Sequence, residues 1–271
     1  MISTETISKS RFLMCPPGHY DVAHEASPWT RRPRAVDQKR AGAQWQALYD
    51  WLSAKVPAAV EVMDPIKGLP DLVCAARSGF MSRGRWIKSR FRQRDRRNEE
   101  IEIERWFRKK NYEVKTVAEP YFFEGEGDLL RMGSELFAGY HFRSELESLE
   151  NVAGLMKRNH SALEISDERF YHLDSCFGPL DDKTALIFQG AFEPYAYLTL
   201  LEMVPDPILV PETEALRFAC NSFCVEKQVV MPLGCPETRK AIESRGFEVT
   251  ELDFSEYLKS GGAAKSLVLN L

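Results

Sequence analysis

The chain has 271 residues and a net charge of −4 at pH 7, with 44% hydrophobic and 28% charged residues. These values are typical of a soluble globular protein with a sizeable core, and they exclude a general electrostatic attraction to nucleic acid. No stretch approaches the roughly 18 apolar residues of a membrane span, and residues 1–11 are polar rather than signal-like. We therefore expect a cytoplasmic protein without membrane contact.

Three helices can be placed in chain order. Residues 38–56 put four large apolar side chains on one helical face, namely Trp45, Leu48, Tyr49 and Leu52. Ser144 and Glu147 have the spacing of a capping box in front of a helix at 145–157. Pro236 suits the first turn of a helix at 237–245.

Short strand-like segments follow helical stretches five times, at 60–63, 113–116, 163–165, 208–210 and 248–250. Successive segments are 40 to 53 residues apart, which is the period of repeat architectures. With further strands at 185–188 and 229–231, the pattern predicts a closed α/β arrangement with rough fivefold symmetry. No change of composition marks a linker, so we expect one domain covering residues 1–271. Closure would gather loops at a central axis, where residues distant in sequence meet.

Six cysteines, at positions 15, 74, 176, 220, 224 and 235, show no pairing pattern. Cys220 and Cys224 are close together, but neither has a nearby histidine or a second cysteine pair, so no zinc site is expected. We predict reduced, mostly buried thiols.

Three segments far apart in the chain carry the residue types of a covalent catalyst. They are Phe-Glu-Gly-Glu-Gly-Asp at 123–128, Tyr-His-Leu-Asp at 171–174 and Gly-Gly-Ala-Ala-Lys-Ser at 261–266. A carboxylate, a histidine and a nucleophile are the minimum for covalent chemistry on a cationic carbon. Whether the chain is an enzyme depends largely on Ser266, the nucleophile candidate.

The order and spacing of these and other motifs resemble the guanidine-modifying superfamily of arginine deiminases, dimethylarginine dimethylaminohydrolases and amidinotransferases. The resemblance is greatest to the compact dimethylaminohydrolase-like and arginine-dihydrolase branch. It covers nearly the whole chain, through segments 12–17, 69–73, 123–128, 139–143, 171–174, 217–221 and 261–269. It implies a five-bladed α/β propeller (the pentein fold), a small guanidino compound as partner, and neither a metal nor an organic cofactor.

The resemblance also implies a role for each candidate residue. Glu124 and Asp174 would hold the planar guanidinium, and His172 would protonate the departing amine and then activate water. Ser266 occupies the position of the family's nucleophilic cysteine. The substrate-binding candidates are Arg143, which resembles the residue that grips the α-carboxylate, together with Arg77, Asp71 and Asn221.

Three departures from the family pattern bear on activity. Besides Ser266, the segment that often reads Phe-Thr-Ala-Asn is Cys-Ala-Ala-Arg at 74–77, and the early Asn-Pro-Trp is Ser-Pro-Trp at 27–29. A guanidinium at Arg77 would repel a cationic substrate if it entered the pocket, and the sequence leaves open whether it does. A cysteine-to-serine change is also a means of trapping a ligand, but the other two departures favour natural divergence.

The sequence therefore predicts a hydrolase-family protein for arginine or a methylarginine, of the type giving citrulline through a covalent intermediate, and impaired by the serine. A non-catalytic protein that binds a small ligand or partner protein through a remodelled pocket is the alternative. A third hypothesis, a nucleic-acid groove over the basic run 83–97, is disfavoured because acidic residues at 99–104 follow it at once and would offset its charge. The sequence leaves the oligomeric state undetermined.

Overall fold

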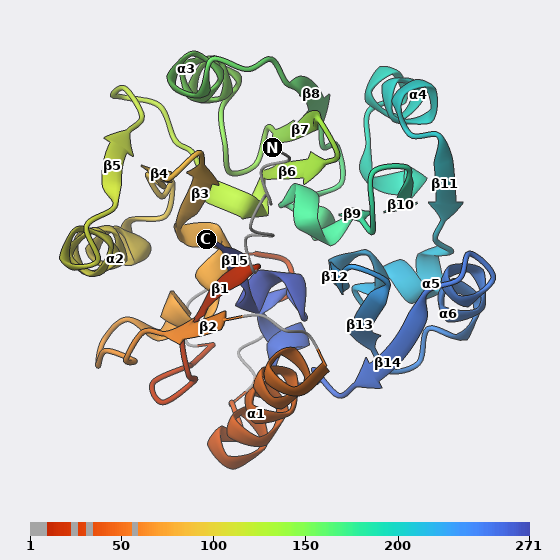
Figure 1. The fold of residues 1–271 in the computed structure, drawn as a ribbon, viewed down its shortest axis with the longest axis horizontal. Coiled ribbons are helices and arrows are strands. Elements are labelled where there is room, and N and C mark those ends of the chain that lie inside the picture. Colours follow the sequence, from red (N-terminus) through yellow and green to blue (C-terminus); the bar gives the residue numbers. More distant parts are fainter. Residues whose placement is uncertain (1–9, 23–26, 31–34, 56–58) are drawn as a thin grey trace, which may run out of the picture.

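The computed structural model describes residues 10–22, 27–30, 35–55 and 59–271. In these residues, five three-stranded sheets are arranged around a central axis, with helices on the outside (Figure 1). In each sheet the middle strand pairs antiparallel with an inner strand and parallel with an outer one. A helix connects the middle strand to the outer strand in every case. This confirms the predicted five-bladed α/β propeller.

Each of the five modules contains an inner, a middle and an outer strand. In that order, the strands are β15 (Leu269–Asn270), β1 (Arg11–Met14) and β2 (Ala59–Val62); β3 (Gly79–Ser82), β4 (Arg85–Lys88) and β5 (Glu113–Thr116); β6 (Leu129–Met132), β7 (Glu135–Tyr140) and β8 (Ser161–Glu164); β9 (Phe177–Pro179), β10 (Thr184–Ile187) and β11 (Asp206–Leu209); and β12 (Phe223–Val225), β13 (Gln228–Pro232) and β14 (Glu248–Leu252). All five strand-like segments of the repeat coincide with or overlap the outer strands.

The connecting helices, in module order, are α1 (Gln38–Lys55), α2 (Arg97–Lys109), α3 (Leu146–Met156), α4 (Pro194–Met203) and α6 (Pro236–Glu243), and α5 (Glu212–Ala215) is a short turn after β11. The apolar face predicted for α1 is directed inward, with Leu48 and Leu52 fully buried and Trp45 stacked on Tyr49 at 5.3 Å. Pro236 is the first residue of α6, as expected. Residue 56, the last residue predicted for the first helix, lies outside the described residues. Residues 1–9, where we expect no signal segment, also lie outside them.

The predicted capping box at α3 is wrong. Glu145 is the N-cap residue of that helix, and no side chain caps it. The hydroxyl of Ser144 instead donates to the carboxylate of Asp128 at 2.6 Å and accepts the backbone N–H of Glu124 at 3.0 Å. A serine hydroxyl can hydrogen-bond either to the end of a helix or to another polar group. Here the Ser144 hydroxyl binds the buried carboxylate of Asp128.

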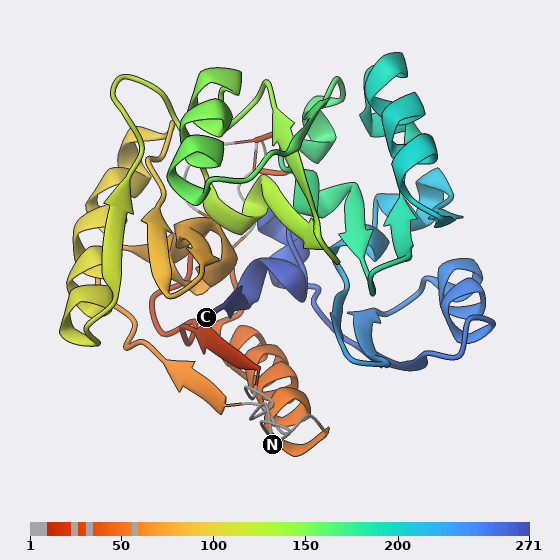
Figure 2. The same cartoon turned by 45° about the horizontal axis from the view of Figure 1, so that its top comes forward.

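The ring is closed by the end of the chain, because β15 pairs with β1 in the first module. Immediately before each inner strand the backbone makes a 3₁₀ turn, and these turns are Ala75–Ser78, Gly125–Gly127, Leu173–Ser175, Ala219–Asn221 and Lys265–Leu267. Figure 2 shows the C-terminal segment in the middle of the ring. Five short turns from five modules therefore meet near the axis, each contributing polar groups from a different part of the sequence. In the described part of the chain, no helix has both the length and the apolar character to span a membrane.

Candidate active site

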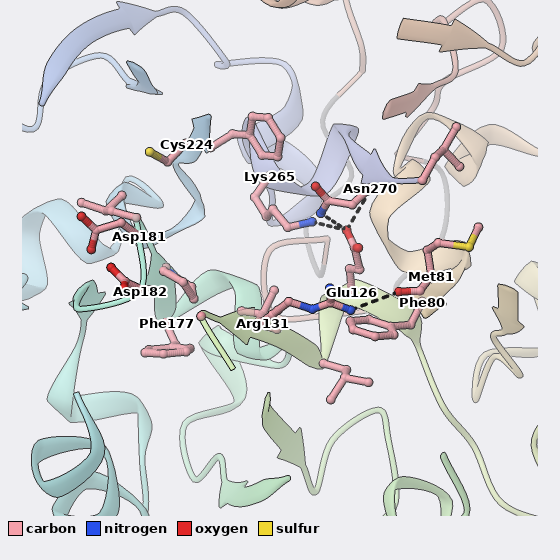
Figure 3. A pocket seen from close by; sticks show the side chains of 18 of the residues that line it. Phe80, Met81, Glu126, Arg131, Phe177, Asp181, Asp182, Cys224, Lys265 and Asn270 are labelled. Carbon is pink, nitrogen blue, oxygen red and sulfur yellow. Dashed lines mark hydrogen bonds and ion pairs between the residues drawn. The ribbon is translucent and has the colours of Figure 1, made fainter. Parts of the chain in front are cut away.

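Two of the cavities between described residues bear on the site, and they share no lining residue. The larger, about 660 Å³, is lined by residues of the inner strands (Figure 3), and the Lys265 ammonium and the Asn270 amide bind the Glu126 carboxylate there at 2.7 and 2.9 Å. None of the predicted site residues lines it. The smaller cavity, about 40 Å³, is lined by five of them: Asp71, Arg77, Glu124, Arg143 and His172. The predicted site therefore centres on the small cavity, and the other three candidates, Asp174, Asn221 and Ser266, line neither cavity.

His172 is held between two carboxylates and is 1% exposed. Its Nδ1 lies 3.0 Å from Asp128 Oδ1, and its Nε2 lies 3.3 Å from Glu124 Oε2. This close approach requires a glycine at 127, because a Cβ there would lie 2.9 Å from Nδ1. Asp128 also accepts the backbone N–H of Leu173 at 3.2 Å. The imidazole is fixed by contacts on both nitrogens, as a proton-transfer group requires.

Glu124 is buried and ionised. Burial acts to raise the pKa of this carboxyl, but the hydrogen bond and charge of His172, with the charges of Arg143 and Arg96, lower it to about 2. The backbone N–H of Arg92 also donates to Oε1 at 3.1 Å. An anionic carboxylate in a water-poor pocket is suited to contact a cation.

The low pKa of Glu124 predicts that its carboxylate makes a pH-dependent contribution to stability. The substitution Glu124→Gln should remove this contribution. The folded-state value of about 2 lies below the ordinary 4.5, so the stabilisation is complete above about pH 4.5 and is lost as the pH falls towards about 2. We expect the free energy of unfolding to fall between about pH 5 and pH 2.5 by up to about 3 kcal/mol more for the unmodified chain than for Glu124→Gln. Urea unfolding at several pH values checks this, with exposed Glu135→Gln as control. The prediction would be contradicted if the free energy of unfolding fell with pH to the same extent in the unmodified chain and in Glu124→Gln.

Ser266 is anchored by two polar side chains, Asp174 and Asn221. Its hydroxyl donates to Asp174 Oδ2 at 3.0 Å and lies 3.2 Å from Asn221 Oδ1. Asn221 in turn donates from Nδ2 to the Asp174 carbonyl at 3.0 Å and accepts the N–H of Ala263 at 2.8 Å. Asp174 therefore lies against the hydroxyl, and the carboxylate partners of His172 are Asp128 and Glu124.

Arg77 enters the site, which settles the question that the sequence leaves open. Its side chain is buried, and Nη2 donates to the Gly261 carbonyl at 3.1 Å and to Ser266 Oγ at 3.4 Å. Its guanidinium carbon lies 5.6 Å from the ring centre of Tyr171. A Cβ at Gly262 would lie 2.8 Å from Ser266 Oγ and 3.4 Å from Arg77 Nη2. The glycine at 262 thus allows both groups to approach the backbone.

Arg143 and Asp71 lie on the wall of the small cavity. The guanidinium carbon of Arg143 is 4.5 Å from the ring centre of Tyr171. Asp71 Oδ2 lies 3.8 Å from Nε of Arg96, whose strongest contact is an ion pair with Glu99 at 2.7 Å. Arg143 and Asp71, two of the four predicted substrate-binding residues, therefore lie at the cavity. The Asp71 carboxylate is directed partly towards the Arg96 guanidinium.

Sequence reasoning missed the roles of Asp128, Ser144 and Tyr171 in assembling the site. Asp128 ends the Phe-Glu-Gly-Glu-Gly-Asp motif, so an acidic residue at a fixed distance from Glu124 was the available signal. Tyr171 precedes His172, and its hydroxyl donates to the Ser260 carbonyl at 2.7 Å. In the described part of the chain, no group of three or more potential metal-binding side chains occurs.

Four of the eight basic residues in the run 83–97 form ion pairs with described residues. Carboxylates lie at 2.7 Å from Lys88, 3.1 Å from Arg90, 3.1 Å from Arg92 and 2.7 Å from Arg96. These pairs agree with a salt-bridged surface, and the expectation that no nucleic acid binds stays a prediction.

The fivefold α/β propeller thus places a carboxylate-bound histidine and two guanidinium groups on the wall of one small cavity, with the carboxylate-bound hydroxyl of Ser266 lying 3.4 Å from one of these guanidinium groups. No protein-family model matches the chain. The bifunctional arginine dihydrolase/ornithine cyclodeaminase AgrE of Nostoc sp. is 41% identical over 270 residues, covering 97% of this chain and 38% of that protein. The N(G),N(G)-dimethylarginine dimethylaminohydrolase of Mycobacterium tuberculosis is 33% identical, covering 96% of this chain and 85% of that protein.

Solved structures agree with these relatives. The N-terminal domain of ArgZ, an arginine dihydrolase from cyanobacteria, was solved as a cysteine-to-serine mutant bound to substrate. It matches with a TM-score of 0.93 at 37% identity, covering 97% of this chain and 98% of that one. The chain belongs to the guanidine-modifying superfamily. It spans 38% and 37% of the lengths of the bifunctional relatives AgrE and ArgZ.

Proposed function

We propose that the chain carries the substrate-handling framework of a hydrolase for arginine or a methylated arginine, and that its own turnover to citrulline is impaired at Ser266. The observation that carries the proposal is that Glu124 and His172 line one cavity with Arg77, whose guanidinium reaches the Ser266 hydroxyl. That hydroxyl is in turn bound to Asp174. Relatives support it: one was solved with its substrate as a cysteine-to-serine mutant, and another with L-arginine as a cysteine-to-alanine mutant.

The mechanism follows from the chemistry of the guanidinium. Its carbon is a poor electrophile because the positive charge is spread over three nitrogens, so carboxylate contacts and a strong nucleophile are needed. A thiolate at position 266 would form a C–S bond as a C–N bond breaks, and His172 would supply the proton of the departing amine. Water deprotonated by His172 would then attack the same carbon, break the C–S bond and release citrulline.

The hydroxyl of Ser266 lacks the activation that this mechanism needs. An alcohol requires a strong adjacent base, and the base in contact with it is the Asp174 carboxylate, at 3.0 Å. A carboxylate is too weak a base to deprotonate an alcohol to a useful extent. Both nitrogens of His172 face carboxylates instead. These contacts account for the impairment that we propose.

A second candidate function is a non-catalytic pocket that binds a small ligand or a partner protein. The observation that favours it is Arg77, whose guanidinium lies 3.4 Å from Ser266 Oγ and leaves a cavity of about 40 Å³. Pockets for drug-sized ligands have roughly 300–1,000 Å³. The chain as it stands therefore has little room for arginine.

The test compares citrulline release from arginine and its methylated forms by the unmodified chain and by Ser266→Cys/Arg77→Asn. Release by the variant alone supports an impaired hydrolase framework. Release by the unmodified chain would show that the hydroxyl is activated. A folded double variant that binds arginine without releasing citrulline would favour the non-catalytic function.

A further inference from the structure

Arg77 is an unusual residue to find inside a pocket for cations. Its side chain is 5% exposed, and its Nε has no hydrogen-bond partner among the described residues. Its guanidinium donates hydrogen bonds to a carbonyl and a hydroxyl oxygen, both uncharged acceptors. Burying a charge in this way is costly unless its surroundings compensate for it.

The electrostatic surroundings of Arg77 favour its charged form. Burial acts to lower the pKa of its side chain, but interactions with Tyr171 and the neighbouring carboxylates Asp174 and Glu124, among other groups, raise it well above its ordinary value. The group therefore stays charged. Its Cγ lies close to Gly127, where a Cβ would be 3.2 Å away. A side chain at 127 would hinder this placement.

The position of the guanidinium decides what else can bind. A reacting guanidino group would have to lie next to the Ser266 hydroxyl, because reacting atoms approach to about 3–3.5 Å. The Nη2 nitrogen of Arg77 lies 3.4 Å from that hydroxyl, so the Arg77 guanidinium fills part of this space. The remaining cavity of about 40 Å³ is of the size that holds ordered water. An acceptor is nevertheless unused, because Asp174 Oδ1 is buried with no hydrogen-bond partner among the described residues.

We infer that Arg77 is a tethered guanidinium that fills the subsite for the guanidino group, so that the unmodified pocket excludes arginine-like cations and a pocket without Arg77 accepts them. The inference rests on the proposed function, because Ser266 defines where that subsite lies. Arg77 is thus a specificity-determining residue. Its side chain occupies the subsite that the guanidino group of a ligand would otherwise fill.

The experiment uses free guanidinium ion and L-arginine as probes, with Ser266 unchanged so that no turnover is needed. Arg77→Ala and Arg77→Asn each vacate the subsite. Arg105→Ala is the matched control, since it removes the same charge from a side chain that is 67% exposed and paired with Glu102. Thermal unfolding is followed with guanidinium chloride against equal sodium chloride, and arginine binding is measured by calorimetry.

We expect guanidinium to raise the Tm of the two Arg77 variants by about 3 °C at about ten times its Kd. The unmodified chain and Arg105→Ala should show no rise over sodium chloride. Arginine should bind the Arg77 variants at least about tenfold more tightly than the unmodified chain, which is about 1.4 kcal/mol. An Arg77→Ala variant that folds only with guanidinium present also supports the inference.

Two binding results would overturn the inference: the unmodified chain binding arginine as tightly as Arg77→Asn, or an Arg77→Asn variant, folded by circular dichroism, that binds neither probe. If Arg77→Ala fails to fold under all conditions, Arg77→Asn decides. Failure of the proposed function looks different. A double variant that binds arginine without releasing citrulline leaves the inference standing, whereas Ser266→Cys releasing citrulline with Arg77 in place overturns the inference alone.

Discussion

Ser266→Cys/Arg77→Asn is expected to release citrulline from arginine at least about 10³-fold faster than the unmodified chain. A thiol has a pKa near about 8.5, so it supplies a nucleophilic thiolate that an alcohol does not. Removing Arg77 clears the guanidinium that lies 3.4 Å from Ser266 Oγ. Each single substitution should give a much smaller rate increase. Ser266→Cys leaves the subsite filled by Arg77, and Arg77→Asn leaves the hydroxyl of Ser266 in place.

The four forms therefore make a double-mutant cycle with strong positive coupling. Ser260→Cys/Arg77→Asn is a matched control, since Ser260 lines the small cavity together with Arg77 but its hydroxyl lies 2.7 Å from that of Tyr20. This control should be inactive. Equal rates for Arg77→Asn and the double variant, or activity of the control, would contradict the nucleophile position that we assign. Equal rates for Ser266→Cys and the double variant would contradict the role of Arg77 instead.

His172→Ala in the Ser266→Cys/Arg77→Asn background is expected to reduce citrulline release by about 10²–10⁴-fold, the usual contribution of a positioned acid or base. The imidazole is held at 3.0 Å by Asp128 and at 3.3 Å by Glu124, so its loss removes the group that protonates the amine. Initial rates over a pH series, with arginine binding measured separately, distinguish a catalytic loss from a binding loss.

His141→Ala serves as the control for this prediction, because that histidine side chain is 53% exposed. It should retain nearly full activity. A His172→Ala variant that keeps more than half of the rate would show that the proton comes from another group.

The sequence predicted the periphery of the fold better than its centre. The outer strands and helices such as α1 and α6 were found because each carries a local pattern of apolar residues and helix ends. The inner strands β3, β6, β9 and β12 were missed. They have three or four residues, and β9 contains both Gly178 and Pro179. Strands this short lack the alternation that reveals a longer strand.

The candidate site was predicted through its motifs, but its internal contacts could not be. The spacing of Tyr171 to Asp174 pairs His172 with Asp174 in sequence, whereas the folded chain pairs it with Asp128, 44 residues away. The direction of Arg77 depends on glycines at 127 and 262, which belong to the two modules on either side of its own. Contacts of this kind are fixed by closure of the ring, which no local pattern encodes.

The most direct test of an impaired nucleophile at position 266 is the intact mass of Ser266→Cys/Arg77→Asn quenched in acid during turnover of arginine. We expect a covalent adduct with the mass of arginine less ammonia, mapped by peptide digestion to residue 266 and absent from the unmodified chain. A solved relative whose structure holds a covalently bound reaction intermediate gives precedent for such a species. An adduct on another residue, or on Ser266 of the unmodified chain, would contradict the claim that an impaired nucleophile limits this site.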